Sequence, residues 1–502
     1  MKRLTRVLAV MATAAPLVLS GTLAGGPAAR AATAYPPGGP DQTPVMGWSG
    51  WSFLRLGANA AQVEGEANAL VSTGLAAAGY QYVNIDDGWY QCPGSQGPNV
   101  DAYGRWVVNA ANYPGVGSEN GIQALAAYVH SLGLKFGIYE TAGISSQAVA
   151  ANTPILGTSD TADGIATTAA QNNYNCGGMM AINYSAPGAQ AYVNSIVDEL
   201  ASWGVDYIKL DGITNSNGPD IQAWQAAIQQ SGRPMVLNIT QGSFTIKLAP
   251  TLKQYANQWE FDPDIELNGP DEGSANSCNT PPYTGCLSVF PLTSYADWND
   301  RFASVASWQP YGGPGGFNDY DSMEVGDGST DSGMSLAASE SQLSLWSLGS
   351  APLILGSDLT SSVTNAYGTS ASLTSRDFSL LTNRAVIGVD QDSIDASRIA
   401  VTGSPGSKAG HQVFAKVEAS GDAVVGLFNT TTKLSSSPVA ISTTAAALGL
   451  PADANGYEVQ DLWGSQSVVA GGQTTFDISS AGKISATVPA EGVALYRVIP
   501  LP

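Results

Sequence analysis

Two groups of acidic residues stand directly after short apolar runs, where they could act as a nucleophile and as a general acid. In the run 206–211, Lys209 and Asp211 would share one face of a strand, because side chains alternate along a strand. An ammonium group beside a carboxyl group favours the ionised form that a nucleophile needs. In the second group, residues 260–266, four acids within seven residues should raise the pKa of at least one of them, as a general acid requires. The pattern indicates chemistry by paired carboxyl groups, and its structural alternatives are a solvated ion pair and an exposed or cation-binding acidic loop.

Further polar and aromatic residues follow other apolar runs of the same kind. Asp86 and Asp87 come after residues 82–85, and Glu140 comes after residues 134–139. Four tryptophans near such positions would offer flat faces to a sugar ring, although any one of them alone is more often ordinary packing. They are Trp48, Trp51, Trp89 and Trp259.

Histidine and cysteine chemistry is poorly supported. The two histidines, His130 and His411, do not make a metal cluster or a histidine-based triad, so we expect no metal site. The four cysteines lack zinc-site spacing and suit an oxidising compartment. Cys278 and Cys286 are close in a loop-like stretch, which favours pairing them together and Cys92 with Cys176, although four cysteines allow three connectivities.

The first 31 residues have the pattern of a cleavable signal peptide: a basic start, an apolar run over residues 7–19 and a small-residue end at 29–31. A membrane anchor is the alternative, which Pro16 and the cleavage pattern disfavour. Cleavage would take the formal net charge from −21 to −25, since it removes four basic residues and no acid. So acidic a chain is unsuited to nucleic acid or acidic lipid. We therefore expect a secreted, extracellular protein with a neutral or cationic partner.

The elements that must position these residues are alternating strands and helices. Strand-like runs separated by helix-like segments recur over residues 40–395, which predicts a parallel α/β structure closed into a (β/α)₈ TIM barrel. An open doubly wound sheet is the second possibility, but no Gly-x-Gly-x-x-Gly turn follows the first strand. From about residue 401 to 502, short alternating strands and turns predict a small C-terminal antiparallel β-sandwich.

Several motifs, in chain order, resemble glycoside hydrolase family twenty-seven, which contains α-galactosidases and α-N-acetylgalactosaminidases. The resemblance extends from residue 44 to about 392, and the strand ending 493–496 is similar to that family's β domain. The motifs are 44–51 (PVMGWSGW), 84–89 (NIDDGW), 133–139 (GLKFGIY), 203–211 (WGVDYIKLD), 316–326 (GFNDYDSMEVG), 351–356 (APLILG) and 381–383 (LTN).

The resemblance implies a retaining glycosidase without a cofactor, in which Asp211 is the nucleophile and Asp264 the acid/base. Two such carboxyl groups should lie ~5 to 5.5 Å apart. The resemblance places Asp86, Asp87 and Lys209 on sugar hydroxyls and Trp48 in the pocket wall. Further candidates for substrate binding are Tyr139, Trp259 and Glu260.

The sequence departs from the family pattern in three places. Glu260 stands where the family has an arginine that contacts the second hydroxyl of the sugar, Asp211 is followed by Gly212-Ile213 rather than Asn-Cys, and residues 237–240 lack a tryptophan. These changes affect the expected sugar specificity more than the fold or the reaction. We expect an exo-acting α-galactosidase, with a β-L-arabinopyranosidase, an isomaltose-releasing enzyme or a non-catalytic carbohydrate-binding protein as alternatives.

Overall fold

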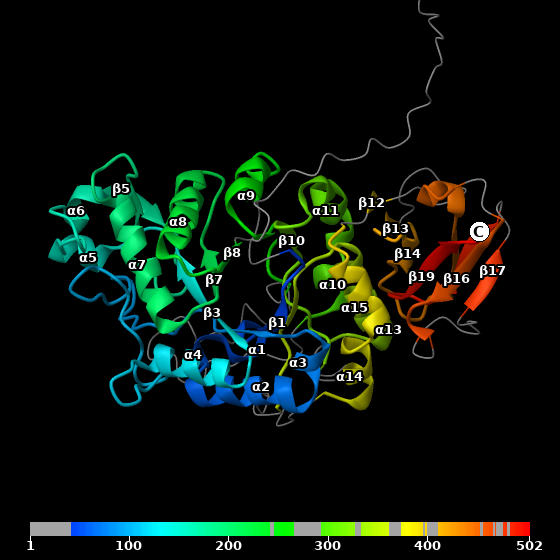
Figure 1. Cartoon of the computed structure of the whole chain (residues 1–502), viewed down its shortest axis with the longest axis horizontal. Coiled ribbons are helices and arrows are strands. Elements are labelled where there is room, and N and C mark those ends of the chain that lie inside the picture. Colours follow the sequence, from blue (N-terminus) through cyan, green and yellow to red (C-terminus); the bar gives the residue numbers. More distant parts are fainter. Residues whose placement is uncertain are drawn as a thin grey trace, which may run out of the picture. The chain divides into compact units, whose positions relative to one another are not determined.

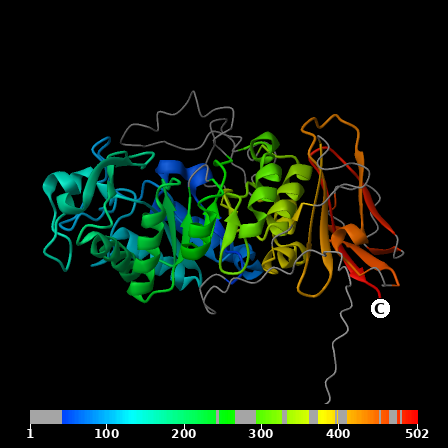
Figure 2. The ribbon, with the colours of Figure 1, turned by 90° about the horizontal axis from the view of Figure 1, so that it is seen from above.

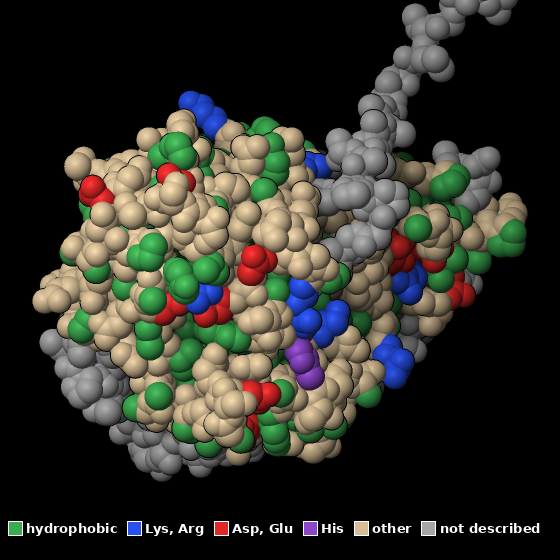
Figure 3. All heavy atoms as spheres, turned by 60° about the vertical axis from the view of Figure 1, so that its left-hand side comes forward, with side chains coloured by type: hydrophobic (Ala, Val, Ile, Leu, Met, Phe, Trp, Pro, Cys, Tyr) green, Lys and Arg blue, Asp and Glu red, His purple; other side chains and the backbone are tan. Residues whose placement is uncertain are grey.

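A computed structural model of the chain (Figure 1) describes residues 42–240, 245–265, 293–326, 333–360, 373–394, 397–398, 410–451, 455–464, 467, 475–478 and 482–502. The predicted signal peptide, Cys278 and Cys286 lie outside these residues. Within them, no helix is long and apolar enough to cross a membrane. On the face of the molecule seen in Figure 3, charged side chains are sparse and scattered among polar and hydrophobic ones, as expected when 12% of all residues are charged.

Eight parallel strands form the main sheet, which confirms the predicted barrel fold. Their order is β10-β9-β8-β7-β3-β2-β1-β11, so the first barrel strand pairs with the last. After β10, Met323 forms a parallel bridge with Leu355 of β11, which brings the two ends of the sheet together. The strands are β1 (Met46–Ser49), β2 (Tyr82–Asn84), β3 (Lys135–Thr141), β7 (Tyr207–Asp211), β8 (Val236–Ile239), β9 (Gln258–Glu260), β10 (Phe317–Asp319) and β11 (Leu353–Leu355).

The two ends of the barrel interior have different compositions. Near the amino ends of the strands, a buried apolar layer fills the interior, and its two tyrosine rings meet edge to face at 5.9 Å. Nearer the middle, Gly137 of β3 allows close approach, because a Cβ there would lie 2.0 Å from Oδ1 of Asn84. The apolar layer consists of Val45, Tyr82, Tyr207, Val236 and Ile354.

Helices connect successive strands and surround the sheet (Figures 1 and 2). Their starts follow from the sequence where asparagine caps them: Asn59 and Asn120 accept hydrogen bonds from backbone N–H groups in the first turns of α2 and α4. The last turn of α7 ends at Gly204, whose φ of 91° suits glycine. The helices are α1 (Trp51–Leu54), α2 (Ala60–Ser72), α3 (Leu75–Ala78), α4 (Gly121–Ser131), α7 (Ala189–Trp203), α8 (Gly218–Ser231), α9 (Ala249–Tyr255), α10 (Tyr295–Trp298), α11 (Arg301–Trp308), α13 (Leu336–Leu348), α14 (Ser375–Leu381) and α15 (Arg384–Gln391).

An antiparallel insertion lies between β3 and α7. It contains β4 (Ile144–Ser145), α5 (Ser146–Ala151), α6 (Ala162–Ile165), β5 (Ala166–Gln171) and β6 (Met179–Ile182), with strand order β4-β6-β5. The loop between β5 and β6 carries Cys176, which forms a disulfide with Cys92. This is the pairing that the sequence analysis favoured, and it ties the insertion to the segment after β2.

The C-terminal strands are antiparallel and form a six-stranded sheet and a two-stranded sheet, as predicted for a β-sandwich. A separate apolar cluster fills this region. The six-stranded sheet has the order β12-β13-β14-β19-β16-β17, and the other pairs β15 with β18. The strands are β12 (Ser397–Arg398), β13 (His411–Val417), β14 (Ala423–Asn429), β15 (Val439–Thr444), β16 (Tyr457–Asp461), β17 (Thr475–Ile478), β18 (Lys483–Val488) and β19 (Val493–Pro500).

Helix α13 contacts the C-terminal sheet through β13, β14 and β19 (Figure 1). Because it packs between the barrel and this sheet, its polar residues are buried as well as its apolar ones. The strand β12 precedes residue 401 and yet pairs with β13. We therefore propose that the two domains divide between residues 394 and 397.

Candidate active site

The carboxyl ends of the barrel strands carry most of the polar side chains that the sequence singled out. Asp211 is the last residue of β7 and Glu260 the last of β9, while Asp86 lies two residues after β2. Side-chain alternation points Lys209 and Asp211 of β7 to the same side as Tyr207, which belongs to the interior layer. The strands thus direct these groups into the barrel mouth, where barrel enzymes hold their working residues.

Lys209 pairs with Asp86 rather than with Asp211. Its Nζ lies 2.7 Å from Oδ2 of Asp86. Burial raises the pKa of Asp211 to about 7, although the ammonium group of Lys209 and the N–H of Gly212 act in the opposite direction. Lys209 thus favours the ionised form of Asp211, as the sequence predicted, but burial outweighs this effect and the net shift of the Asp211 pKa is upward.

The acidic segment after β9 divides into two parts that face different neighbours. Burial raises the pKa of Glu260 well above its usual value, and the charges of Asp321 and Asp264 raise it further. The prediction that an acid here has a raised pKa is confirmed. In contrast, Asp262 faces Arg301, with 3.7 Å between Oδ2 and the nearer guanidinium nitrogen. Of the acids in this segment, Glu260 and Asp264 act electrostatically on Lys209 in the barrel mouth. Such effects are large, since two like charges 4 Å apart repel by roughly 4 kcal/mol at an effective dielectric constant of ~20.

Two buried groups hold the Asp264 turn in place. The guanidinium of Arg301, 1% exposed, donates hydrogen bonds to the backbone oxygens of Pro263 and Tyr320. Oδ2 of Asp321 accepts a hydrogen bond of 2.7 Å from the backbone N–H of Ile265, the residue after Asp264. These contacts fix the backbone on both sides of Asp264.

Two tyrosines border the carboxyl groups. The Tyr139 hydroxyl is buried and has no hydrogen-bond partner among the described residues. Burial raises the pKa of Tyr139, and the charges of Asp87 and Asp211 contribute. Tyr174, on the insertion, is 57% exposed, and its pKa is raised to about 12, first by burial and then by Asp211, Asp264 and Glu260. An exposed aromatic ring beside acidic groups is suited to stacking on a sugar.

Two of the predicted tryptophans do not face the site. Trp259 is fully buried, and its indole N–H donates a hydrogen bond of 2.8 Å to Oδ1 of Asn318 on the neighbouring strand. Trp48 is also fully buried and donates to the backbone oxygen of Ser357 at 3.0 Å. Both predictions are wrong for the same reason: alternation along a short strand turns these residues toward the helices. Trp51, the second residue after the end of β1, is partly exposed.

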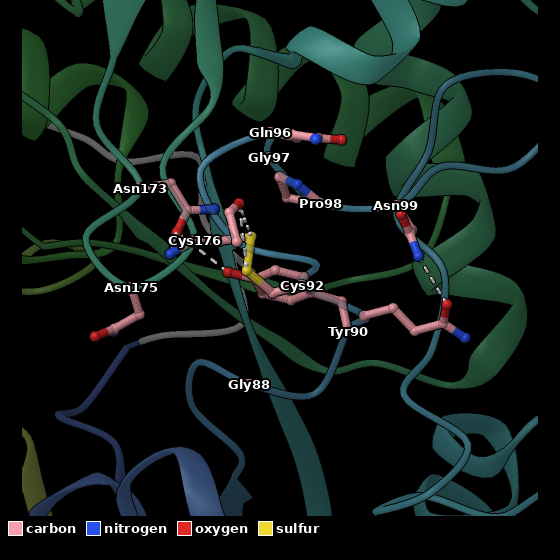
Figure 4. The surroundings of a disulfide bond; sticks show 12 residues. Gly88, Tyr90, Cys92, Gln96, Gly97, Pro98, Asn99, Asn173, Asn175 and Cys176 are labelled. Atoms are coloured by element: carbon pink, nitrogen blue, oxygen red, sulfur yellow. Dashed lines mark hydrogen bonds between the residues drawn. A yellow bond between two sulfur atoms is a disulfide. The ribbon is translucent and has the colours of Figure 1, made fainter. Parts of the chain in front are cut away.

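Asp87 connects the barrel to the insertion. Its Oδ2 accepts a hydrogen bond of 2.6 Å from Nδ2 of Asn175, and its Oδ1 accepts one from the N–H of Gly88. Figure 4 shows Asn175 beside Cys176 on the loop that the disulfide holds. Burial raises the pKa of Asp87 to about 6, with Asp86 contributing. Asp87 also lines a cavity of ≈ 340 Å³ whose other polar lining residues include Asn99, Asn109, Asn112 and Asn175.

Sequence reasoning missed other polar residues of the barrel mouth and its surroundings. Asp319 ends β10 and accepts a hydrogen bond of 3.0 Å from Nδ2 of Asn238 on β8. Their positions at strand ends could have identified Asp319, Asp321 and Asn238. Tyr174 lies in a loop of the insertion, for which no strand pattern gave a signal.

The arrangement is suited to acid–base and nucleophilic chemistry. Asp211 and Asp264 influence each other electrostatically, and Lys209 is raised in pKa by both of them together with Asp86 and Glu260. Carboxyl groups with raised pKa values can exchange protons near neutral pH.

Family comparisons cover both parts of the chain. The family model described as "Alpha galactosidase A" matches residues 43–171 and 288–392, and the one described as "Alpha galactosidase C-terminal beta sandwich domain" matches residues 408–498. The first match leaves out residues 172–287, which contain Lys209, Asp211, Glu260 and Asp264.

Individual proteins match over nearly the whole chain. An α-galactosidase of Oryza sativa subsp. japonica is 30% identical over 91% of this chain and 85% of its own length. An α-galactosidase of Cyamopsis tetragonoloba is 31% identical over 91% and 87%. Among solved structures, a family twenty-seven β-L-arabinopyranosidase of Geobacillus stearothermophilus, in complex with arabinose, has a TM-score of 0.74 and 25% identity, and covers 92% of this chain and 98% of that one.

Proposed function

The chain belongs to the α-galactosidase family, glycoside hydrolase family twenty-seven, and from this premise we propose that it releases terminal α-galactosyl units with retention of configuration. In this proposal Asp211 is the nucleophile and Asp264 the acid/base. The observation that carries it is the position of both carboxyl groups at the carboxyl end of the barrel, where the pKa of Asp211 responds to Asp264.

The proposed reaction has two steps. In the first, Asp264 gives its proton to the glycosidic oxygen while a carboxylate oxygen of Asp211 attacks the anomeric carbon, so that the carbon–oxygen bond to the leaving group breaks. In the second, Asp264 takes a proton from water, whose oxygen displaces Asp211 from the same carbon. Two inversions give net retention, and both carboxyl groups return to their starting forms.

The surrounding residues support the choice of Asp264 over Asp262 as the acid/base. Asp262 lies against Arg301 and accepts a hydrogen bond from Ser304, which engages it away from Asp211. Backbone hydrogen bonds to Arg301 and Asp321 on either side hold Asp264 in position. A general acid must be held at a fixed distance from the bond that it protonates, and this anchoring meets that requirement.

We propose that the sugar is bound by Asp86 and Lys209 through its hydroxyl groups, with the exposed ring of Tyr174 as a stacking surface. The pair of Asp86 and Lys209 offers both a hydrogen-bond acceptor and donors. Asp87, by contrast, already binds Asn175 and Gly88, so its main effect on the sugar is to position the insertion.

The structural likeness to a β-L-arabinopyranosidase supports a second candidate substrate. β-L-Arabinopyranose has the ring configuration of α-D-galactopyranose and lacks only the hydroxymethyl group on C5. The same two carboxyl groups would therefore serve both sugars, and the residues around C5 would decide between them.

We further propose secretion with removal of residues 1–31, consistent with the disulfide between Cys92 and Cys176, since such bonds persist in oxidising compartments. The expected partner is a neutral carbohydrate.

A panel of p-nitrophenyl glycosides tests the proposal. We expect kcat/KM to be highest for the α-D-galactoside, lower for the β-L-arabinopyranoside and lowest for the α-isomaltoside. Proton NMR during the reaction should show α-galactose as the first product. Preference for another sugar would replace the substrate assignment, whereas β-galactose as the first product would overturn the retaining mechanism.

A further inference from the structure

Three carboxyl groups converge at the barrel mouth from three parts of the chain. Glu260 ends β9, Asp264 lies in the turn that follows, and Asp321 comes two residues after β10. One oxygen of each can be chosen so that all three lie within 4.8 Å of one another. Like charges at this distance repel unless something positive lies between them.

One oxygen of this cluster lacks a partner. Glu260 is 4% exposed, and its Oε1 has no hydrogen-bond donor among the described residues. A buried carboxylate oxygen without a donor is unfavourable, because it loses hydration and gains nothing in return. The ammonium group of Lys209 acts on Glu260, but its hydrogen bond goes to Asp86.

We propose that Glu260, Asp264 and Asp321 bind a divalent cation, for which calcium is the best fit. Calcium takes oxygen ligands at roughly 2.3–2.6 Å, so that ligands on opposite sides are about 4.6–5.2 Å apart. Three carboxyl oxygens within 4.8 Å of one another fit this range. Calcium tolerates the irregular geometry that ligands from separate segments impose, whereas magnesium demands a near-ideal octahedron. Three protein ligands leave further positions for water or for sugar hydroxyls.

The cation would also affect turnover, and this consequence, unlike the binding itself, rests on the proposed role of Asp264. A carboxylate bound to calcium has no proton to give to a leaving group. Bound calcium should thus lower kcat/KM most for substrates with poor leaving groups.

Isothermal titration calorimetry of the full-length chain, freed of metal with a chelator and dialysed, tests the binding without any substrate. Calcium chloride should bind at one site per chain. Glu260→Gln should weaken the binding at least tenfold, since the amide keeps the shape but loses the charge. Asp321→Asn should weaken it likewise.

Asp262→Asn is the matched control, because Asp262 lies in the same segment but faces Arg301; it should bind calcium within twofold of the parent. Thermal melting establishes that each variant is folded. Absence of calcium binding by the parent, or unchanged binding by Glu260→Gln, would overturn the proposal. The proposal would also be overturned if galactosamine hydrochloride, rather than calcium, bound in a way that depends on Glu260. The cluster would then bind the ammonium group of an amino sugar. A glycosidase that turns over substrate yet binds no calcium would refute this inference alone.

Discussion

The two ends of the barrel interior are built on the same strands and yet have opposite chemistry. At the amino ends, Tyr82, Tyr207, Val236 and Ile354 form part of a closed apolar layer. At the carboxyl ends, the same interior side carries Asp211 and other acids, most of them with raised pKa values. The amino end stabilises the fold by burying apolar surface, whereas the carboxyl end holds charged groups out of water, which destabilises the fold.

A polar layer joins the two ends. The Tyr207 hydroxyl is 3.1 Å from Oε1 of Gln258 and accepts a hydrogen bond of 2.7 Å from Nδ2 of Asn238, whose Nδ2 also contacts Asp319. The tyrosine ring thus belongs to the apolar layer and its hydroxyl to the site. Substitutions at the carboxyl ends of the strands should affect mainly turnover, whereas substitutions at the amino ends should affect mainly stability.

The largest effect is expected for Asp211→Asn. An amide can neither attack the anomeric carbon nor stabilise its developing charge, so kcat should fall at least roughly a thousandfold. Steady-state kinetics with p-nitrophenyl α-galactoside measures this. Residual activity within tenfold of the parent would contradict the assignment.

The same variant should alter the pH dependence of stability. The fold raises the pKa of Asp211 from 3.8 to about 7, so the native state holds this proton more tightly than the unfolded state does. The parent should therefore lose stability as the pH rises from about 4 to about 7, and Asp211→Asn should lose less over that range. Urea unfolding at several pH values compares the two proteins.

For Asp264→Ala, loss of the proton donor should matter most with poor leaving groups. We expect kcat/KM to fall by roughly 10²–10⁴ on natural galactosides and by less on activated aryl galactosides. Asp262→Ala is the control at the neighbouring acid. If Asp262→Ala shows the dependence on leaving group instead, the wrong member of the acidic segment has been chosen.

At the opposite end, Ile354→Ala should destabilise the fold without impairing the chemistry. Truncation of a buried isoleucine costs roughly 2–5 kcal/mol of unfolding free energy. We expect kcat/KM to stay within about threefold of the parent below the melting transition. A large loss of activity with unchanged stability would show that the two ends are not separable in this way.

The smallest effect is expected on the pH profile of Lys209→Met. Because the ammonium group lowers the pKa of Asp211, its removal should shift the acidic limb of the pH profile of kcat/KM to higher pH, by roughly one pH unit. A limb that stays in place or moves downward would show that Lys209 does not stabilise the ionised nucleophile. KM is expected to rise as well, since Asp86 loses its partner.

The sequence predicted the fold well because hydrophobic periodicity and strand–helix alternation are local signals. The C-terminal strands also followed from alternation, apart from β12 and β17. The sequence did not predict which side of a short strand a residue faces, so Trp48 and Trp259 were misplaced. The sequence also did not predict burial. It placed Lys209 and Asp211 on one face, but the desolvation that raises the pKa of Asp211 depends on the surrounding strands.

The contribution of the insertion depends on tertiary contacts. Nothing local marks Tyr174 as a neighbour of Asp211, because tertiary contacts bring the loop to the site, among them the disulfide at Cys176 and the hydrogen bond from Asn175 to Asp87. The different surroundings of Asp262 and Asp264 likewise depend on Arg301, 39 residues after Asp262 in the chain.

Trapping the covalent intermediate tests the central claim most directly. A 5-fluoro-α-galactosyl fluoride should inactivate the enzyme, with the mass increasing by one fluorogalactosyl group per chain. Peptide mass spectrometry should locate that group on the carboxyl group of Asp211, and Asp211→Asn should not be labelled. A label on Asp264, Asp262 or Glu260, or hydrolysis of activated galactosides without any trappable intermediate and with inverted product, would contradict the account.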